Sequence, residues 1–295
     1  MIAVTGASGK LGSLVLDGLL KVVRQDQLVA IVRTPEKAAR FTAQGVKVRH
    51  GDYEQPHTLA PALAGVKRLL LVSGMDMGRR VQQHRAVIEA AKAAGIELLA
   101  YTSVLRADSS TLPIAGEHKA TEDLLHGSGL PYVILRNGWY IENYTERLAM
   151  PLQYGAFMGA AQNGRIAAAS RDDYAAAAVA VLTADGHRGK TYELAGDYAF
   201  TMSDLASEVS RWAGRPIPYK DLPASAYKQA LAPAGLPAEI VDLLVGTDLA
   251  IARGDLDDSS RDLHKLIGRD TQTLTGVLAR IPKPQAQGAT AGSTR

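Results

Sequence analysis

The sequence contains no cysteine among its 295 residues. Disulfide bonds, thiol nucleophiles and thiolate metal sites are therefore excluded. Aromatic residues make up only 5% of the chain, so we expect a core of aliphatic side chains. The formal net charge is only +3, and so small an excess in so long a chain does not indicate a nucleic-acid partner.

Long apolar runs are also missing. The most apolar run, residues 175–184, has about half of the roughly 20 residues that a membrane-spanning helix needs, so no membrane span is expected. The sequence opens with residues typical of a buried strand and has no basic segment before them, so no secretory signal is expected. We therefore expect a cytoplasmic protein.

The first 140 residues alternate short apolar runs with amphipathic stretches. Strands are predicted at 2–5, 28–33, 46–50, 68–73, 98–103 and 132–137, and helices at 10–23, 35–43, 56–63, 79–94 and 115–126. Several helices end at a glycine, as at Gly45, Gly65 and Gly95, where a left-handed cap is needed. This alternation predicts an α/β fold with a Rossmann-like, doubly wound parallel sheet.

The alternation weakens after residue 140. We expect residues 1–140 to form one domain, with a helix and strand in 165–196 returning to it. Residues 141–164 and 197–281 are predicted to form a smaller, mostly helical C-terminal lobe. Residues 282–295 are mostly Pro, Gln, Gly, Ala, Ser and Thr without a period, which predicts a disordered tail.

A glycine-rich segment with the spacing GxxGxxG lies between the first predicted strand and the first predicted helix. It comprises Gly6, Ala7, Ser8, Gly9, Lys10, Leu11 and Gly12. Gly6 permits a tight turn, Gly9 lets the backbone approach a diphosphate, and Gly12 allows close helix packing. The helix N-terminus then favours the anion. The alternative is a turn without a ligand, but this position favours a dinucleotide site.

The end of the second predicted strand indicates which dinucleotide binds. An NAD site carries an acid there to bind the ribose diol, whereas this sequence has Arg33, with Lys37 one turn into the next helix. A guanidinium suits a 2′-phosphate and has no reason to prefer a diol. The alternative is a solvated surface arginine. We predict that residues 1–140 bind NADP(H).

Two further strand ends supply cofactor-site candidates. Asp52 is placed to accept a hydrogen bond from the adenine amine, and Tyr53 to cover the adenine ring. The alternatives are a helix N-cap for Asp52 and a packed, half-exposed ring for Tyr53. Ser73 and Gly74 end the fourth strand, at the rim where a doubly wound sheet binds its ligand.

The tyrosine and lysine pair that many carbonyl reductases use as a proton donor is absent. None of the 11 tyrosines is followed by a lysine four residues later. Hydride addition to a ketone gives an alkoxide about as basic as hydroxide (water pKa about 15.7), which needs an acid. A reduced quinone is a phenolate-like anion with a pKa of about 10, which water protonates. The absence of the tyrosine and lysine pair is therefore compatible with reduction of a quinone or a cationic dye, and also with no catalysis.

His118 and Glu122 occupy the helix segment where that pair is expected, four residues apart on one helix face. Metal binding and proton shuttling are alternatives, but without a third ligand we favour a surface pair. Residues 255–258 begin like a calcium loop, but the required glycine and final glutamate are missing. No metal site is predicted.

Polar and aromatic residues are dense after the sixth strand. Asn137 and the backbone after it are candidates to meet the nicotinamide, and Trp139, Tyr140 and Asn143 are candidates for an aromatic acceptor pocket. The alternative is a packed loop that joins the two lobes.

These residues carry a resemblance to the NmrA-like branch of the atypical short-chain dehydrogenases, over nearly the whole chain to about residue 281. Within that branch the sequence most resembles bacterial NADPH-dependent quinone oxidoreductases, and next the triphenylmethane dye reductases. The segments that carry the resemblance are 1–12, 31–33, 51–53, 117–122, 137–140, 192–197 and 265–268.

The resemblance implies NADPH bound by the glycine turn and Arg33, with a quinone over the nicotinamide near Tyr140 and Asn143. Lys10 departs from the glutamine expected there, and we expect it to add a contact to phosphate. The first hypothesis is direct hydride transfer from NADPH to a quinone without flavin or metal. The alternatives are a non-catalytic NADP(H)-sensing regulatory protein and a reductase of another aromatic acceptor, such as a triphenylmethane dye. The oligomeric state, including a homodimer, is left open.

Overall fold

The first domain is built on a seven-stranded parallel sheet. The computed structural model describes residues 1–284, so residues 285–295 of the predicted tail lie outside it. The strands in spatial order are β3 (Lys47–His50), β2 (Leu28–Val32), β1 (Ile2–Val4), β4 (Arg68–Leu71), β5 (Leu98–Val104), β6 (Tyr132–Asn137) and β8 (Thr191–Leu194). The doubly wound sheet is confirmed, with every strand close to its predicted bounds.

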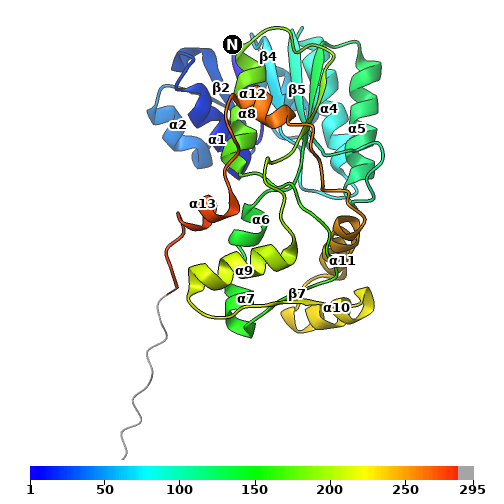
Figure 1. Cartoon of the computed structure of the whole chain (residues 1–295). Helices are drawn as coiled ribbons and strands as arrows, with labels where there is room; N and C mark the ends of the chain where they lie inside the picture. The colour runs from blue at the N-terminus through cyan, green and yellow to red at the C-terminus, as the bar shows by residue number, and fades with distance from the viewer. Residues whose placement is uncertain (285–295) are drawn as a thin grey trace, which may run out of the picture.

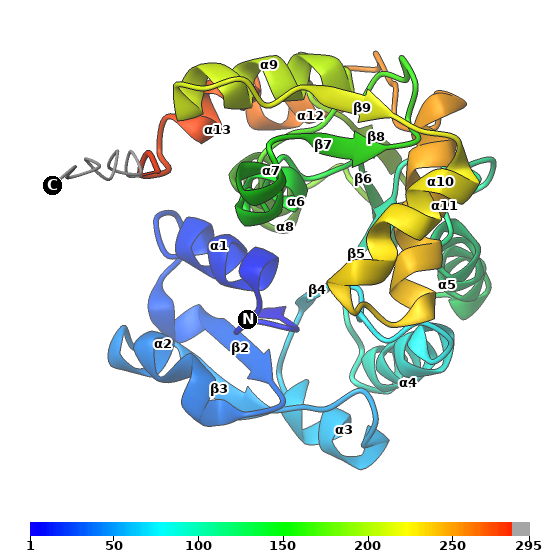
Figure 2. The ribbon, with the colours of Figure 1, turned by 90° about the horizontal axis from the view of Figure 1, so that it is seen from below.

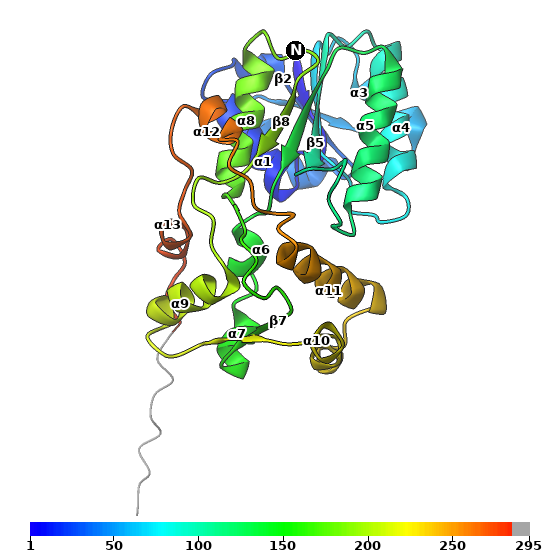
Figure 3. The same ribbon diagram turned by 45° about the vertical axis from the view of Figure 1, so that its right-hand side comes forward.

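Helices cover both faces of this sheet (Figure 3). One face is covered by α1 (Lys10–Leu19), α2 (Ala39–Ala43), α8 (Arg171–Thr183) and α12 (Asp262–Ile267), and the other by α3 (Leu59–Ala62), α4 (Arg80–Ala93) and α5 (Ala115–Ser128). Because both faces are covered, β2 and β5 are buried along their whole length. This explains why their sequences are continuously apolar or nearly so.

The predicted helix ends follow local backbone chemistry. Gly45, Gly65 and Gly95 all adopt positive φ, as predicted. Helix α8 begins with a capping box. The Ser170 side chain accepts from the Asp173 N–H, and the Asp173 side chain accepts from the Ser170 N–H. The helices predicted at 35–43 and 56–63 each open with a 3₁₀ turn, and the helix predicted at 10–23 ends at Leu19.

The second lobe is mostly helical and lies below the carboxyl ends of the strands (Figure 1). It contains the parallel pair β7 (Phe157–Gly159) and β9 (Tyr219–Asp221), with α6 (Glu142–Thr145), α7 (Ala149–Tyr154), α9 (Met202–Ala213), α10 (Ala224–Leu231), α11 (Ala238–Ala252) and α13 (Leu274–Leu278). Helix α12, from the segment assigned to this lobe, instead buries Leu263 in the core of the first domain. No helix within residues 1–284 is long and apolar enough to cross a membrane.

The chain order predicts where on the sheet a ligand binds. From β1 the chain builds outward through β2 and β3, then returns to the other side of β1 with β4 and builds through β5, β6 and β8. Figure 2, seen from the side of the second lobe, shows β2 and β3 on one side of β4, and β5 and β6 on the other. The edge of the sheet at the carboxyl ends of β1 and β4 is the expected binding position for this topology.

Candidate cofactor and acceptor site

The turn after β1 has the geometry that a diphosphate needs. Gly6 has φ +56°, which favours glycine, and the Gly9 N–H donates to the Gly6 carbonyl oxygen over 2.8 Å. A Cβ on Gly12 would lie 2.4 Å from the same oxygen, so only glycine lets α1 begin so close to the turn. Helix α1 also has no side-chain cap at Gly9. Its N-terminus is therefore suited to an anion.

The other residues of the turn divide between core and surface. Ala7 and Leu11 are buried and fix the turn and α1 to the sheet, while Ser8 is exposed. The Lys10 ammonium lies 2.5 Å from a carboxylate oxygen of Glu146, which Arg171 also contacts. Burial opposes ionisation of Glu146, but these two cations outweigh it and lower the pKa of the carboxyl. Lys10 thus joins the turn to the start of the second lobe, a partner that the sequence did not predict.

Arg33 and Lys37 lie beyond the carboxyl end of β2 and are both exposed. Within residues 1–284 neither side chain makes a hydrogen bond or ion pair to the protein. Their positive charges are therefore available to a phosphate at this corner of the sheet edge.

Asp52 and Tyr53 lie beside this corner but are held by the protein. Asp52 accepts hydrogen bonds from the backbone N–H of Glu54 and from the Gln55 side chain, so it stabilises the turn after β3. The Tyr53 hydroxyl is within hydrogen-bond distance of Thr5 Oγ1, at 2.5 Å, and of the Val72 carbonyl, at 2.9 Å. Burial raises the pKa of this hydroxyl. Tyr53 therefore connects the ends of β3, β1 and β4.

The end of β6 carries a buried amide with an unused acceptor. Asn137 is only 4% exposed, and its Nδ2 donates to the Tyr140 hydroxyl over 3.4 Å. Its Oδ1 is buried and has no hydrogen-bond partner among the described residues. A buried acceptor without a donor is costly, and the carboxamide of a nicotinamide supplies a donor of the right kind. The residues present therefore fit a nicotinamide dinucleotide.

The aromatic residues after Asn137 pack in different directions. The Tyr140 ring packs edge-on against Tyr174, and the Arg171 guanidinium lies 5.2 Å from its centroid. Trp139 packs against the core of the second lobe. Asn143, at the start of α6, is partly buried, and no hydrogen bond involves its side chain within residues 1–284.

The prediction of a surface pair at His118 and Glu122 is wrong. His118 is 4% exposed and Glu122 is fully buried. The His118 Nδ1 lies 2.8 Å from the Tyr101 hydroxyl, and Glu122 accepts two hydrogen bonds from Arg136. Burial, with a smaller repulsion from Arg80, lowers the pKa of His118 to about 3. The helix pattern alone did not reveal this, because the partners come from β5 and β6.

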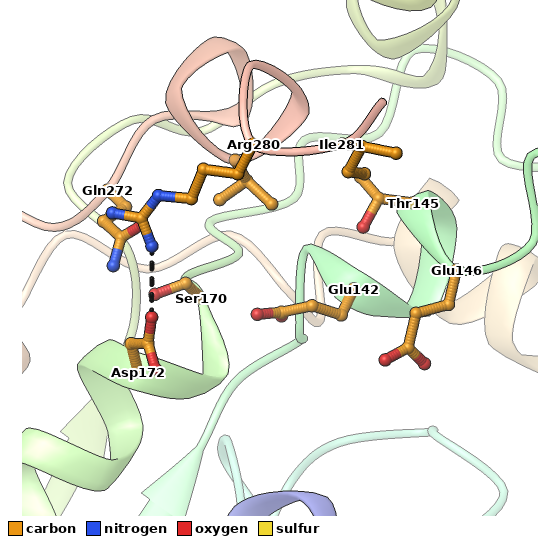
Figure 4. Close-up of a pocket in the computed structure, with 9 residues that line it drawn as sticks. Glu142, Thr145, Glu146, Ser170, Asp172, Gln272, Arg280 and Ile281 are labelled. Atoms are coloured by element: carbon orange, nitrogen blue, oxygen red, sulfur yellow. Dashed lines mark hydrogen bonds and ion pairs between the residues drawn. The ribbon is translucent and has the colours of Figure 1, made fainter. Parts of the chain in front are cut away.

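A cavity of about 370 Å³ lies between α6, the start of α8 and α13 (Figure 4). Its charged lining residues are Glu142, Glu146, Asp172 and Arg280, and Asp172 pairs with Arg280 over 3.2 Å. Burial raises the pKa of Glu142. Of the described residues that line this cavity, none is a predicted cofactor or acceptor residue.

One group of side chains within residues 1–284 has the spacing of metal ligands: Asp197, His264 and Asp270. The Arg261 guanidinium already lies among them, with Nε 3.2 Å from Asp197 and a terminal nitrogen 3.5 Å from Asp270. The Arg261 guanidinium therefore neutralises the carboxylates of Asp197 and Asp270. The geometry is that of an ion-pair network at the start of α12.

Comparison with known proteins agrees with this geometry. A family model described as NAD(P)H-binding matches residues 6–185. The sequence is 49% identical over 281 residues to quinone oxidoreductase 2 of Escherichia coli K12, an alignment that covers 95% of this chain and 98% of that protein.

Solved structures extend the similarity to three dimensions. The E. coli NADPH-dependent quinone oxidoreductase complexed with NADPH matches with a TM-score of 0.92 and 48% identity, covering 95% of this chain and 99% of that one. The Citrobacter sp. triphenylmethane reductase complexed with NADP(H) matches with a TM-score of 0.90 and 38% identity, covering 95% of this chain and 100% of that one.

Proposed function

The chain belongs to the NAD(P)H-binding family, and on that premise we propose that it is an NADPH-dependent quinone oxidoreductase. The observation that carries this proposal is 49% identity to E. coli quinone oxidoreductase 2 across nearly the whole of both chains. NADPH supplies the hydride, and the protein supplies proximity, orientation and electrostatics.

The cofactor side of the proposed site follows the carboxyl edge of the sheet. The glycine turn receives the diphosphate, Arg33 and Lys37 bind the 2′-phosphate, and Asn137 Oδ1 accepts from the nicotinamide carboxamide. The full set of proposed cofactor residues is Gly6, Ala7, Ser8, Gly9, Lys10, Leu11, Gly12, Arg33, Lys37, Asp52, Tyr53, Ser73, Gly74 and Asn137. The cradle at Gly12 and the unpaired acceptor at Asn137 support it.

The acceptor side is assigned to Trp139, Tyr140 and Asn143. Support comes from their position directly after Asn137, where the chain leaves the sheet for the second lobe. Tyr140 orients the Asn137 amide through its hydroxyl. In this proposal Asn143 offers its amide to a quinone oxygen.

The reduced quinone takes its proton from water. Each titratable group on the relevant segment of α5 already has a partner: Glu117 binds Arg80, His118 binds Tyr101, Lys119 binds Asp123 and Glu122 binds Arg136. A hydroquinone anion, with a pKa of about 10, needs no stronger acid. Hydride transfer and protonation are therefore separate events in this proposal.

The test is an assay of purified protein with NADPH and benzoquinone, followed by the loss of reduced nicotinamide absorbance. We expect protein-dependent oxidation of NADPH with one benzoquinone reduced per NADPH. Tight NADPH binding without turnover of any quinone would contradict the proposal and favour the sensing hypothesis. Turnover of triphenylmethane dyes but not of quinones would favour the dye reductase hypothesis.

The proposal extends to location and assembly. A cytoplasmic location is proposed because its reductant, NADPH, is supplied there, and fractionation of cells that express the protein tests it. The oligomeric state is left open between a monomer and a homodimer, and sedimentation equilibrium decides between them. A single species with the chain mass of 31.3 kDa at all concentrations would exclude the dimer.

A further inference from the structure

Two methionines are exposed in one short loop at the carboxyl edge of the sheet. Met75 is 88% exposed and Met77 is 38% exposed. The loop connects β4 to α4, so it leaves the sheet at the carboxyl end of β4, beside β1. That edge of the sheet faces the second lobe (Figure 1). The two apolar side chains are therefore presented to solvent where the topology places a ligand.

The first end of this loop is fixed to α4. The Gly74 N–H donates to His84 Nε2 over 2.9 Å, and Arg80 Nε donates to the Gly74 carbonyl over 2.8 Å. A Cβ on Gly74 would lie 2.8 Å from Gln83 Oε1, so the backbone rests directly on the helix. Burial lowers the pKa of His84 to about 3, so its Nε2 remains an acceptor at neutral pH.

The other end is fixed to both α4 and α5. Glu117 accepts from the Gly78 N–H and from Arg80, each over 2.8 Å. The Arg80 side chain is only 5% exposed, so this ion pair is sheltered from solvent. Between the methionines, Asp76 accepts from the Gln83 side chain over 2.8 Å. The backbone on both sides of each methionine is therefore held in place.

A held backbone that presents two methionines to water indicates a contact surface. Exposing apolar area costs free energy that a bound apolar group recovers. Methionine is unbranched and polarisable, so it adapts to flat rings and makes favourable sulfur–aromatic contacts. The ligand class that fits is a flat, uncharged ring system lying against the loop after β4.

We propose that Met75 and Met77 contact the part of the quinone beyond its reacting ring and thereby determine the preference for larger quinones. This inference rests on the proposed quinone reductase function and adds the residues that select among quinones. It assigns Met75 and Met77 a role in specificity and none in hydride transfer.

The kinetic test compares benzoquinone with dimethylnaphthoquinone, which adds a second ring to the same reacting group. In the Met75→Ala, Met77→Ala double variant we expect KM for dimethylnaphthoquinone to rise about five- to tenfold, as loss of part of two apolar contacts implies. KM for NADPH and kcat with benzoquinone should change less than about twofold. The matched control is Met150→Ala, another exposed methionine, 41% exposed and on α7.

A binding readout independent of turnover is available because the chain has no cysteine. Met75→Cys creates a single thiol, and Met150→Cys is its control. We expect dimethylnaphthoquinone with NADP⁺ to slow N-ethylmaleimide labelling of Met75→Cys about fivefold or more, the protection expected near saturation. Labelling of Met150→Cys should not change.

Three results would overturn the inference. They are unchanged selectivity in the double variant, complete protection of Met75→Cys by NADP⁺ alone, and protection that grows with protein concentration without ligand. Complete protection by NADP⁺ alone would mean that the loop contacts the cofactor. Protection that grows with protein concentration would mean that the loop contacts a second copy of the chain. Failure of the proposed function is a separate result, seen as wild-type protein that does not oxidise NADPH with any quinone.

Discussion

At the scale of single residues, we expect Arg33 to distinguish the two nicotinamide dinucleotides. Its exposed guanidinium makes no bond to the protein within residues 1–284, and in the proposed function a 2′-phosphate supplies its partner. Charge-assisted hydrogen bonds of this kind contribute about 1.5–3 kcal/mol each. Arg33→Ala should therefore weaken NADPH binding roughly 10- to 150-fold and leave NADH binding nearly unchanged.

The measurement is a titration of wild type and Arg33→Ala with both cofactors at one ionic strength, since salt screens exposed charges. Equal weakening of NADPH and NADH would show that Arg33 does not bind the phosphate. Equal affinity of the wild type for both cofactors would contradict the NADP(H) assignment.

Gly12 is a second residue at which the structure predicts the effect of a substitution on stability and on cofactor binding. A methyl group there meets backbone atoms, Gly6 O at 2.4 Å and Ala7 Cα at 3.0 Å, which cannot rotate away. Gly12→Ala should lower the free energy of unfolding by about 2 kcal/mol or more and abolish NADPH binding.

The control is Gly116→Ala on α5, where a Cβ meets nothing within 4 Å. It should leave cofactor binding intact and raise stability by up to about 0.5 kcal/mol. Urea unfolding and an NADPH titration measure both variants. Full NADPH binding by Gly12→Ala would contradict the role of the glycine turn.

The buried state of His118 gives a prediction about pH. Its pKa of about 3 leaves it neutral at and above pH 7, and its partner Tyr101 has a pKa raised chiefly by burial. With water as the proton source, kcat for benzoquinone should be flat between about pH 7 and 8.5. A stopped-flow or steady-state pH profile tests this. A fall of tenfold across that range would indicate a protein acid.

At the scale of elements, the loop after β7 is fixed by side chains from α11 and β9. Asp248 Oδ2 accepts from the Ala160 N–H over 2.8 Å, and the Tyr219 hydroxyl accepts from the Ala161 N–H over 2.9 Å. Burial raises the pKa of Asp248 from 3.8 to about 6. Above pH 6 the folded protein therefore holds a poorly solvated carboxylate, which the unfolded chain solvates well.

The sign of the pH dependence follows from this raised pKa. The contribution of Asp248 to stability is greatest below about pH 4 and is lost as pH rises from 4 to about 6. Asp248→Asn keeps an oxygen acceptor for Ala160 and removes the charge. It should raise the free energy of unfolding at pH 7 by about 1–3 kcal/mol and have little effect near pH 4. Urea unfolding at both pH values measures this, and an equal loss at both would show that the carboxylate itself stabilises the lobe.

At the scale of the whole molecule, the two lobes are joined in several places. The chain crosses between them at each end of the segment 165–196, and α12 packs back onto the sheet. Arg106, in the loop after β5, donates to the carbonyl oxygens of Gly254 and Asp257. The Lys10–Glu146 pair adds a link at the glycine turn. These connections predict that the lobes unfold together.

The two tryptophans, Trp139 and Trp212, both pack in the core of the second lobe. Tryptophan fluorescence therefore reports that lobe, while far-ultraviolet circular dichroism reports both. We expect coincident unfolding transitions by the two probes. NADPH at about a hundred times its Kd should stabilise both by about 2.7 kcal/mol. A cofactor effect confined to the dichroism signal would show that the lobes unfold independently.

The sequence by itself determined the strand and helix alternation, the glycine turn and the position of Arg33. These depend on local rules: apolar period, backbone freedom at Gly6, and the order of residues at a strand end. Only the tertiary structure decided the partners of charged and polar groups. Glu122 is buried because Arg136 on β6 faces it, Lys10 pairs with Glu146 far along the chain, and Glu117 on α5 accepts from the Gly78 N–H of the β4–α4 loop. Such contacts join residues distant in sequence, so no local pattern encodes them.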